Sequence, residues 1–401
     1  MNTIRCIILL IFFAQIYHIE AQRIVLTEKE AIQSALQYNP LMKVSGLKIE
    51  KQEKLKSASY AIRNTELLMQ APVENEFRLG VLQTFDFPTL YSQQKGLQKY
   101  NVKMAVAEKD VTANGLVYNV RINYNDLNFL IQKYNTLKVQ DSVFNDILEI
   151  NEIRYSVGAI SNLEKINGQA YYKQIQFKLL ETITELQNSK IQLAILMGKP
   201  QDTSLYVDGT LKKIDNSRLN LNADSSFANN PITTYYYQGI KVNEKQLKVE
   251  KNRALPGITL GYLDQTNPNN DFLYRVQFGI SLPLWYWTYN SKIGAAKKDL
   301  EIIKTQSQNA NYNLRGEYSK ALAQFRNYSN AVDYFENVGN TLASEILKSA
   351  RESYRLGSIG YYIYLQNINQ SFQIKLDYLQ ALKNYNESVI TLQYLTGIQE
   401  Y

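Results

Sequence analysis

Apolar and polar positions alternate in four short segments of the chain. The clearest is residues 273–284, where every even position from 274 to 284 is apolar and the odd positions between them carry arginine, glutamine, glycine, serine and proline. Such a period of two is typical of a strand with one apolar and one polar face. The same pattern at 76–87, with weaker or shorter segments at 65–71 and 258–263, predicts four strands. The longer two have about the ten residues that a tilted transmembrane strand requires.

The last of these strands provides the candidate membrane surface. Its apolar side is predicted to face lipid through Val276, Phe278, Ile280 and Leu282. Both tryptophans of the chain follow it, in a candidate belt at the membrane–water interface formed by Trp285, Tyr286, Trp287 and Tyr289. Aromatic rings suit that interface because one side can contact lipid while the other meets polar headgroups.

Outside the strands the apolar period becomes helical. All eight prolines lie outside residues 89–199 and 284–401, so long helices can form in these two stretches. Apolar side chains there recur at three- and four-residue intervals, as in a coiled coil. They are Leu116, Val120, Leu127, Leu130, Tyr134, Leu137, Phe144 and Leu148 in the first stretch and Phe325, Tyr328, Val332, Phe335, Leu342 and Ile346 in the second. Each long helix is predicted to end at a glycine and to turn there into a returning helix.

These elements occur twice in the same order. Asn39-Pro40 corresponds to Asn230-Pro231 at an offset of 191 residues, and Gly158 corresponds to Gly357 at an offset of 199. Slowly increasing offsets in constant order indicate an internal duplication. We predict a mainly α fold with a β-barrel contribution, in which each tandem repeat has two transmembrane strands and long coiled-coil helices. The repeats span 22–200, with a helix tip near 158, and 227–401, with a tip near 357, and a surface insert at 201–226 separates them.

Residues 1–21 have the pattern of a cleaved secretory signal, with a basic start, an apolar run of about nine residues and a small residue before Gln22. Cleavage there would remove the only cysteine, Cys6, and the only histidine, His18. The exported chain would lack cysteine nucleophiles, Ser-His-Asp triads and His-ligated metals, so we expect no enzyme activity, no cofactor and no metal site. The net charge of +7 is attributed to solvated helix surfaces rather than to nucleic-acid binding.

After the signal, no segment approaches the roughly 18 consecutive apolar residues of a transmembrane helix, so only the strands could cross a membrane. Four strands cannot close into a barrel, and lipid does not tolerate the open edges of a sheet. Other copies of the chain would have to complete the sheet. Three copies would give a 12-stranded barrel, an even strand count within the range seen for such barrels, with a ring of coiled-coil helices extending away from the membrane.

Several motifs resemble the TolC-like outer-membrane efflux protein family. At the helix tips the motif is Arg154-Tyr-x-x-Gly158-x-x-Ser161-x-Leu-Glu164, repeated as Tyr354-x-x-Gly357. Near the end of the chain the motifs are Tyr378-Leu-Gln-Ala-Leu-x-x-Tyr385-Asn and Leu395-Thr-Gly397. The start of the mature chain carries Leu26-Thr-x-x-x-Ala31-Ile-x-x-Ala35-Leu-x-x-Asn39-Pro40, and the last strand ends in Ser281-Leu-Pro-Leu284. The resemblance implies a trimeric channel in the cell outer membrane, with a periplasmic α-helical barrel that docks through a periplasmic adaptor to an inner-membrane pump of the resistance-nodulation-division type. It also implies that the tips form the periplasmic entrance and contact the adaptor through Arg154, Tyr155, Gly158, Ser161, Tyr354, Arg355 and Gly357.

The sequence departs from that family in two places. Glu164 fits the acidic position after the first tip glycine, but Ile363 occupies the matching position of the second, so an entrance charge would come from Glu164 alone. No cysteine is placed for lipid modification, so anchoring would depend on the barrel. The run Gln83-Thr-Phe-Asp-Phe-Pro88 resembles the branch that serves heavy-metal cation pumps.

The expected function is passive conduction of substrates that the pump expels, with heavy-metal cations as one candidate cargo. Two alternatives stay open. The first is a type I secretion or drug-export channel of the same architecture, and the second is a soluble periplasmic coiled-coil scaffold. The cargo, the cognate pump and the resting state of the entrance do not follow from the sequence.

Overall fold

The structure is a computed structural model that describes residues 25–60, 62–70, 78–201, 205–217, 219, 227, 229–264 and 275–397. The predicted signal at 1–21 lies outside these residues. The chain divides into two compact units: unit 1 is Met1–Ala35, Val120–Lys212 and Val332–Lys383, and unit 2 is Leu36–Asn119, Lys213–Ala331 and Asn384–Tyr401. Each unit contains segments of both repeats, so neither repeat folds as a unit by itself.

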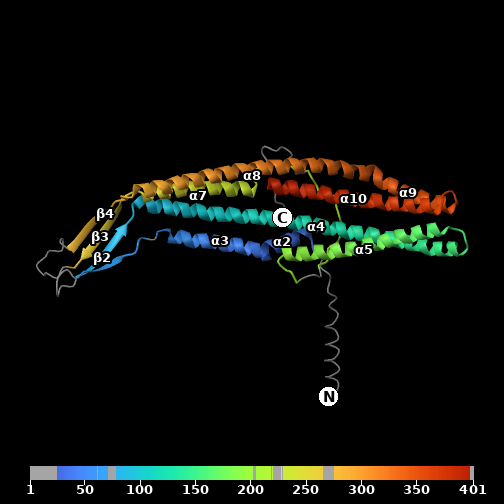
Figure 1. Cartoon of the computed structure of the whole chain (residues 1–401), viewed down its shortest axis with the longest axis horizontal. Helices are drawn as coiled ribbons and strands as arrows, with labels where there is room; N and C mark the ends of the chain where they lie inside the picture. Colours follow the sequence, from blue (N-terminus) through green and yellow to red (C-terminus); the bar gives the residue numbers. More distant parts are fainter. Residues whose placement is uncertain are drawn as a thin grey trace, which may run out of the picture. The chain divides into compact units, whose positions relative to one another are not determined.

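Helices make up most of the described chain (Figure 1). In chain order they are α2 (Glu28–Tyr38), α3 (Pro40–Ser57), α4 (Pro88–Ser156), α5 (Asn162–Leu196), α7 (Pro231–Arg253), α8 (Tyr286–Tyr334), α9 (Asn340–Arg355) and α10 (Tyr361–Thr396). A 3-10 turn (Ala58–Tyr60) follows α3, and a π-helical turn, η4 (Phe335–Gly339), joins α8 to α9. The 69 residues of α4 extend about 100 Å. Within the described ranges, no helix carries an apolar stretch of the length and hydropathy needed to cross a bilayer.

The Asn-Pro pairs of the two repeats begin helices in the same way. Asn39 Oδ1 accepts a hydrogen bond from the N–H of Leu41 at 2.9 Å, and Asn230 Oδ1 accepts one from the N–H of Ile232 at 2.9 Å. The proline after each asparagine occupies the first helical position, where the missing N–H would have had no partner inside the helix. The duplicated motif therefore codes for a duplicated helix start.

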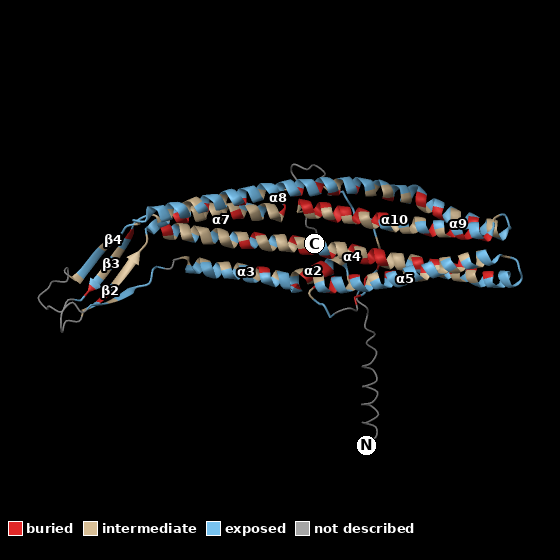
Figure 2. Cartoon of the chain, in the orientation of Figure 1, coloured by how far each residue is buried: buried red, intermediate tan, exposed pale blue. Residues whose placement is uncertain are grey.

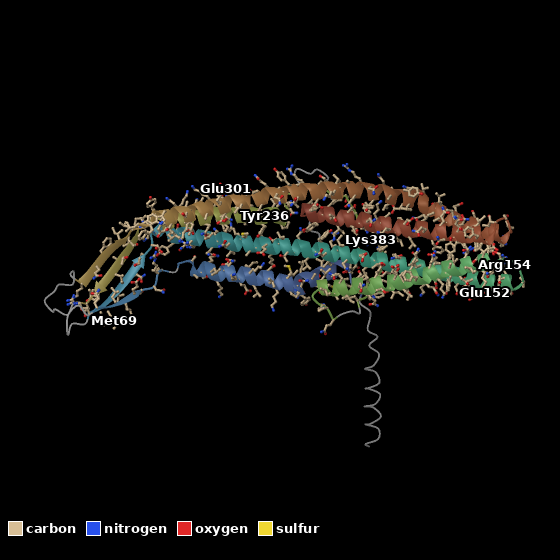
Figure 3. The ribbon with its side chains drawn as sticks, in the orientation of Figure 1. Met69, Glu152, Arg154, Tyr236, Glu301 and Lys383 are labelled. Atoms are coloured by element: carbon tan, nitrogen blue, oxygen red, sulfur yellow. The ribbon has the colours of Figure 1, made fainter. Side chains whose placement is uncertain are left out.

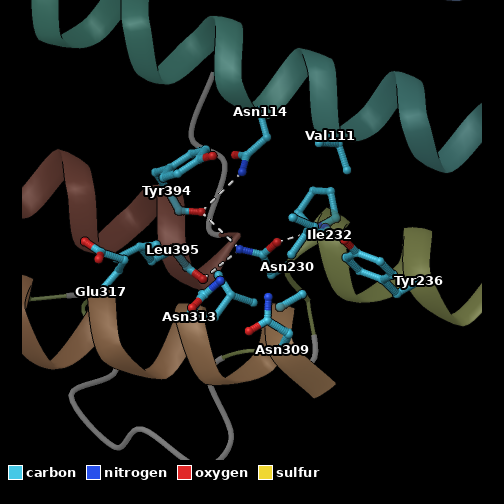
Figure 4. Close-up of a pocket in the computed structure, with 13 residues that line it drawn as sticks. Val111, Asn114, Asn230, Ile232, Tyr236, Asn309, Asn313, Glu317, Tyr394 and Leu395 are labelled. Atoms are coloured by element: carbon cyan, nitrogen blue, oxygen red, sulfur yellow. Dashed lines mark hydrogen bonds between the residues drawn. The ribbon is translucent and has the colours of Figure 1, made fainter. Parts of the chain in front are cut away.

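Asn230 also joins two helices of unit 2 end to end (Figure 4). Its side-chain amide donates to the carbonyl of Leu395 at 2.8 Å, and Asn114 of α4 donates to the carbonyl of Tyr394 at 3.2 Å. Carbonyls in the last turn of a helix have no partner within it, so these amides complete the end of α10. A pocket of about 310 Å³ lies beside the junction, and Asn309, Asn313 and Glu317 of α8 line part of it.

Four strands form one antiparallel sheet in unit 2, in the order β1 (Glu66–Gln70), β2 (Arg78–Phe85), β3 (Gly257–Leu263) and β4 (Val276–Ser281). The first two come from one repeat and the last two from the other. Residues 71–77 and 265–274, where the predicted strands 76–87 and 273–284 begin, lie outside the described residues.

The last strand is shorter at its end than predicted. β4 ends at Ser281 rather than at residue 284, because Pro283 has no N–H for the ladder and the chain turns there, with the N–H of Leu284 donating to the carbonyl of Leu282 at 2.9 Å. Helix α8 then begins at Tyr286. Trp287 and Tyr289 consequently lie in the first turns of a helix and not at the end of a strand.

Most of the predicted coiled-coil positions of α4 are buried, but Tyr134 and Leu148 are only half-buried. Within unit 1, Phe144 and Ile147 of α4 pack with Ile175 of α5 and with Leu365 and Ile368 of α10. In Figure 2 buried positions recur along α4 and α10. The alternating interval of three and four residues keeps these side chains on one face of each helix, which confirms the predicted mainly α fold with long coiled-coil helices.

In the second repeat the buried positions shift by one residue at η4. Val332, before the turn, is buried as predicted, but Leu342 is 47% exposed and its neighbour Ala343 is 0% exposed. The N–H of Asn340 bonds to the carbonyl of Phe335, five residues earlier, so the turn contains an extra residue. The prediction that Leu342 belongs to the buried face was therefore wrong.

The second repeat is also longer than the first in this region. The segment from Pro283 to Gly357 is four residues longer than the matching segment from Pro88 to Gly158. Four residues of an α-helix turn about 400°, which is about 40° past a full turn and would rotate every later side chain. The residue absorbed by the π turn removes the rotation of one α-helical residue, about 100°, so η4 changes the phase of every side chain after it.

We predict that Ala343→Leu destabilises the protein by about 1–3 kcal/mol, because the added carbons have no space in a packed core. Thr341→Leu, at an exposed position two residues away, is the matched control and should have little effect. Thermal unfolding followed by circular dichroism at 222 nm measures both. Equal melting temperatures for the two variants would contradict the shifted register.

Candidate functional site

The two helix tips, both in unit 1, turn in the same way. Gly158 and Gly357 have φ of 73° and 72°, a left-handed conformation that side chains rarely adopt. The N–H of Ala159 donates to the carbonyl of Arg154 at 2.8 Å, and the N–H of Ser358 donates to that of Ser353 at 2.9 Å, as in a Schellman cap. A Cβ on either glycine would meet nothing within 4 Å. Substitution would therefore cost backbone strain and not a steric clash.

Glu164, the predicted entrance charge, is part of a capping box. Its Oε2 accepts hydrogen bonds from the N–H and the hydroxyl of Ser161 at 2.9 and 3.0 Å, and Ser161 Oγ accepts from the N–H of Glu164 at 3.2 Å. These contacts fix the start of α5 directly after the tip. The carboxylate thus has a local structural role, whatever it contributes to ion passage.

Arg154 connects the two tips within unit 1. Its Nη1 donates to the Tyr354 hydroxyl at 2.5 Å, and its guanidinium lies 4.9 Å from the centre of the Tyr354 ring. The Tyr354 ring also stacks on Tyr364, with centroids 4.4 Å apart and 5° between the planes, and lies 6.2 Å from the tilted Tyr361 ring. Arginine and two rings from α4, α9 and α10 are therefore in one contact group, which combines cation–π attraction with a charged hydrogen bond.

A second tyrosine packs into a space that a glycine leaves on α5. A Cβ on Gly168 would come 2.3 Å from the Tyr361 hydroxyl oxygen, so no other residue fits there without displacing the ring. The Tyr361 hydroxyl and both polar atoms of Asn151 are buried without a well-aligned hydrogen bond among the described residues. Burial raises the pKa of Tyr361 well above its usual value, and the nearby Asn151 side chain opposes this only in part.

The other predicted tip residues make contacts within their own hairpins. Tyr155 lies under the ammonium of Lys165, 4.6 Å from the ring centre, and Lys165 pairs with Glu152 at 2.7 Å. Arg355 pairs with Glu352 of its own helix at 2.9 Å. Figure 3 shows Arg154 and Glu152 at the tip end of α4.

Tyr364, Gly168 and Asn151 are not among the residues predicted from the sequence. One signal for the first was present, because Tyr361-Tyr-Ile-Tyr364 places three tyrosines in four residues at the start of a helix. Arg154 and Gly168, the partners of Tyr354 and Tyr361, lie about 200 residues away along the chain, and nothing local indicates them.

One face of the sheet is apolar. Directly paired residues of antiparallel strands share a face, and the registers group Leu67, Met69, Leu79, Val81, Phe85, Ile258, Leu260, Tyr262, Val276, Phe278 and Ile280, with Gln83 among them. Most of these side chains are exposed in the single chain, and Phe278 is exposed by 68%. Leu282 follows the strand and is also exposed. A contiguous apolar surface of this kind normally marks contact with a membrane or a partner.

The opposite face carries small and polar residues, among them Gly80, Thr84, Thr259, Gly261, Gln277, Gly279 and Ser281. The hydroxyls of Thr84 and Thr259 are 3.1 Å apart. A Cβ on Gly80 or Gly261 would come 2.8 Å from a leucine side chain on this face. Side chains are therefore crowded on the polar face and spread on the apolar face.

The predicted belt residues form an aromatic cluster. Trp285 is 67% exposed, and the rings of Trp285 and Trp287 are 5.2 Å apart in an edge-on arrangement. Tyr286 lies 5.5 Å from Trp287 and is also exposed, whereas Tyr289 is half-buried. The cluster begins just after β4 and continues into the first turns of α8.

Helix α5 has a second apolar stripe that was not predicted. Its buried side faces the core of unit 1, but Leu163, Ile166, Phe177, Leu180, Ile191 and Ile195 are exposed on its other side. Their intervals, like those of the buried side, are close to multiples of 3.5 residues. A helix that is apolar on two sides normally has neighbours on both.

The described residues include no group of three or more His, Cys, Asp or Glu side chains placed to hold a metal ion. The features that the described residues do provide are two helix tips in unit 1 joined by an arginine–tyrosine stack and, in unit 2, a two-faced sheet with an aromatic cluster at its border.

No family model matches the sequence, and no curated protein matches it significantly. Solved structures match its fold. The outer membrane channel CmeC of Campylobacter jejuni aligns with a TM-score of 0.79 at 15% identity, over 92% of this chain and 85% of that one. The outer membrane protein VceC of Vibrio cholerae aligns with a TM-score of 0.76 at 16% identity, over 92% and 96% of the two chains. The open-state MtrE channel of Neisseria gonorrhoeae aligns with a TM-score of 0.75 at 15% identity, over 92% and 88%.

The chain therefore has the fold of TolC-like outer-membrane efflux channels. The predicted fold class, long helices in two repeats with a small antiparallel sheet, is confirmed.

We predict that Arg154→Ala and Tyr354→Leu are coupled by about 1 kcal/mol in a double-mutant cycle. Local stability is measured from amide hydrogen exchange in the first turns of α10. Tyr354→Phe separates the two components, because it removes the hydroxyl and keeps the ring. Arg355→Ala is the control, since Arg355 pairs within its own helix. If the effects of Arg154→Ala and Tyr354→Leu are additive, the two tips are not held together by this contact.

Proposed function

We propose that the chain is the outer-membrane channel of an efflux system and passively conducts substrates that a pump expels. The observation that carries the proposal is the sheet, which has an exposed apolar face and a polar face and is joined directly to helices of about 100 Å. In lipid the apolar face would be buried, and the polar face would border water. The fold shared with outer-membrane channels supports this role.

The sheet edges and α5 support a homotrimer. β1 and β4 are the edge strands of the sheet, and their outer backbone groups have no partner strand among the described residues. Unpaired backbone is costly in lipid, so pairing β4 of one copy with β1 of the next is the expected solution. The exposed stripe of α5 gives the helices a surface for the same neighbours. Three copies would give the 12-stranded barrel predicted from the sequence, with a helical barrel in the periplasm.

The tips are the proposed contact with a periplasmic adaptor and with the pump behind it. They combine exposed apolar side chains, such as Val157 and Leu356, with the charges of Arg154 and Arg355. Gly158 and Gly357 fix the shape of both turns, and Ser161 fixes the helix that follows the first. Heavy-metal cations are one proposed cargo class. Because a conduit need not bind what it passes, the cargo is best tested by resistance assays with different pumps.

The decisive experiment combines particle mass with conductance. Protein purified in detergent should have the mass of three chains plus detergent, and in planar bilayers it should give discrete single-channel currents. A protein that is monomeric and stable without detergent would be a soluble coiled-coil scaffold, and the proposal would fail.

We predict that Phe278→Lys prevents assembly, because a cation in the middle of the lipid-facing surface costs about 2–4 kcal/mol in each copy. Gln277→Lys is a closely matched control, since it places the same charge one residue away on the polar face. The readout is the fraction of protein recovered from the membrane as the full-size particle. Equal recovery of the two variants would show that the apolar face does not meet lipid.

A further inference from the structure

The positive charge of the protein is concentrated where four helices of unit 2 meet the sheet. We consider the sixteen residues at each of these places: 48–63 at the end of α3, 88–103 at the start of α4, 241–256 at the end of α7, and 286–301 at the start of α8. Together they contain sixteen Lys and Arg and six Asp and Glu, a net charge of +10, whereas the whole chain has +7. By contrast, unit 1 from residue 25 onward has sixteen basic and seventeen acidic residues.

Most of this charge is not neutralised by neighbouring carboxylates. Four of the six acidic residues are paired within one turn of their own helix: Glu53 with Lys56, Glu244 with Lys241, Glu250 with Arg253, and Glu301 with Lys298. Lys48 and Arg63 pair with Glu108 and Asp86, outside the four segments. Nine lysines have no carboxylate within ion-pair distance among the described residues: Lys51, Lys54, Lys99, Lys103, Lys245, Lys248, Lys251, Lys292 and Lys297.

Helix stability explains only part of the pattern. Cations near the carboxyl end of a helix are favoured by its dipole, which accounts for Lys54 in α3 and Lys251 in α7. The lysines of α4 and α8 lie toward the amino ends, where the dipole favours anions instead, and neither helix has an acidic residue in its first turn. All four helices therefore direct positive charge toward the border of the sheet. Helices α3 and α7 do so through lysines near their carboxyl ends, and α4 and α8 through their positive amino ends and the lysines that follow.

The order of surfaces on unit 2 indicates the ligand. The apolar face of the sheet is followed by the aromatic cluster at Trp285 and Trp287, and this cluster is followed by the lysines, beginning with Lys292 one and a half turns into α8. The same order of hydrocarbon, interface and headgroup occurs across half of a lipid bilayer. Lysines placed just beyond the interface attract anionic headgroups, and the attraction fades within about 8 Å at physiological salt.

We propose that these four helix ends, the basic collar, bind the anionic headgroups of phospholipids in the leaflet on the helix side of the sheet. The inference rests on the proposed function, because it requires the sheet to be in lipid. The collar would hold the channel at a fixed depth in the membrane. In this proposal the excess positive charge of the chain binds lipid headgroups and does not serve only to keep the helices soluble.

The two tryptophans, which lie next to the collar, provide the test. Protein is reconstituted in vesicles that contain either brominated phosphatidylglycerol or brominated phosphatidylcholine at the same mole fraction in an otherwise identical lipid mixture. Bromine quenches tryptophan on contact. The test variant is the triple substitution Lys99→Gln, Lys248→Gln and Lys292→Gln, and the control is Lys138→Gln, Lys320→Gln and Lys348→Gln, which removes the same charge elsewhere.

At low salt we expect brominated phosphatidylglycerol to quench the native protein more strongly than brominated phosphatidylcholine. A lysine near an anionic surface contributes about fivefold in affinity, so the collar variant should reduce the lipid preference by more than about tenfold, as should 0.5 M NaCl. The control variant should keep the preference. Equal quenching of the native protein by the two lipids, or equal behaviour of the two variants, would overturn the collar and leave the channel intact. Quenching by neither lipid would instead contradict insertion of the sheet, and with it the proposed function.

Discussion

The structure depends on one constraint, which is a sheet whose apolar face and edge strands are left uncovered by the described part of the chain. Among the described residues, the four strands leave two open edges and a broad apolar face. Exposing the apolar face to water is unfavourable, and so is exposing unpaired backbone groups to lipid. The proposed environment, with lipid on the apolar face and strands of other copies at the edges, would resolve both conflicts. The second apolar stripe of α5 poses the same problem for the helices, since a single chain covers only one side of this helix.

Within each unit the chain relies on exact helix ends more than on a large core. Long helices leave few loops, but every break exposes backbone groups that need partners. At the tips a left-handed glycine and a capping box supply them, and at the junction of α10 and α7 a single asparagine serves both helices. These local solutions allow narrow helical hairpins to turn within a few residues.

Much of this follows from the sequence because its determinants are local. The strands follow from alternation, the buried face of α4 from its heptads, and the turns from glycine and proline. The predictions that were wrong depend on effects that accumulate along an element or that come from distant parts of the chain. Pro283 ends β4 early through one missing hydrogen bond, and η4 moves the buried face from Leu342 to Ala343 by one inserted residue. The contacts of Arg154 and Gly168 join segments far apart in the chain, and no local pattern records which partner a side chain will meet.

The π turn also bears on how the two repeats have diverged. The second long helix carries four more residues and one wider turn than α4. Its buried positions, counted in steps of three and four residues, are therefore displaced by one residue after η4, whereas those of α4 follow one count throughout. The repeats are therefore no longer interchangeable parts. In a chimera with α4 in place of α8, η4 and α9, the buried positions beyond the site of η4 would no longer match the neighbours that pack against α9.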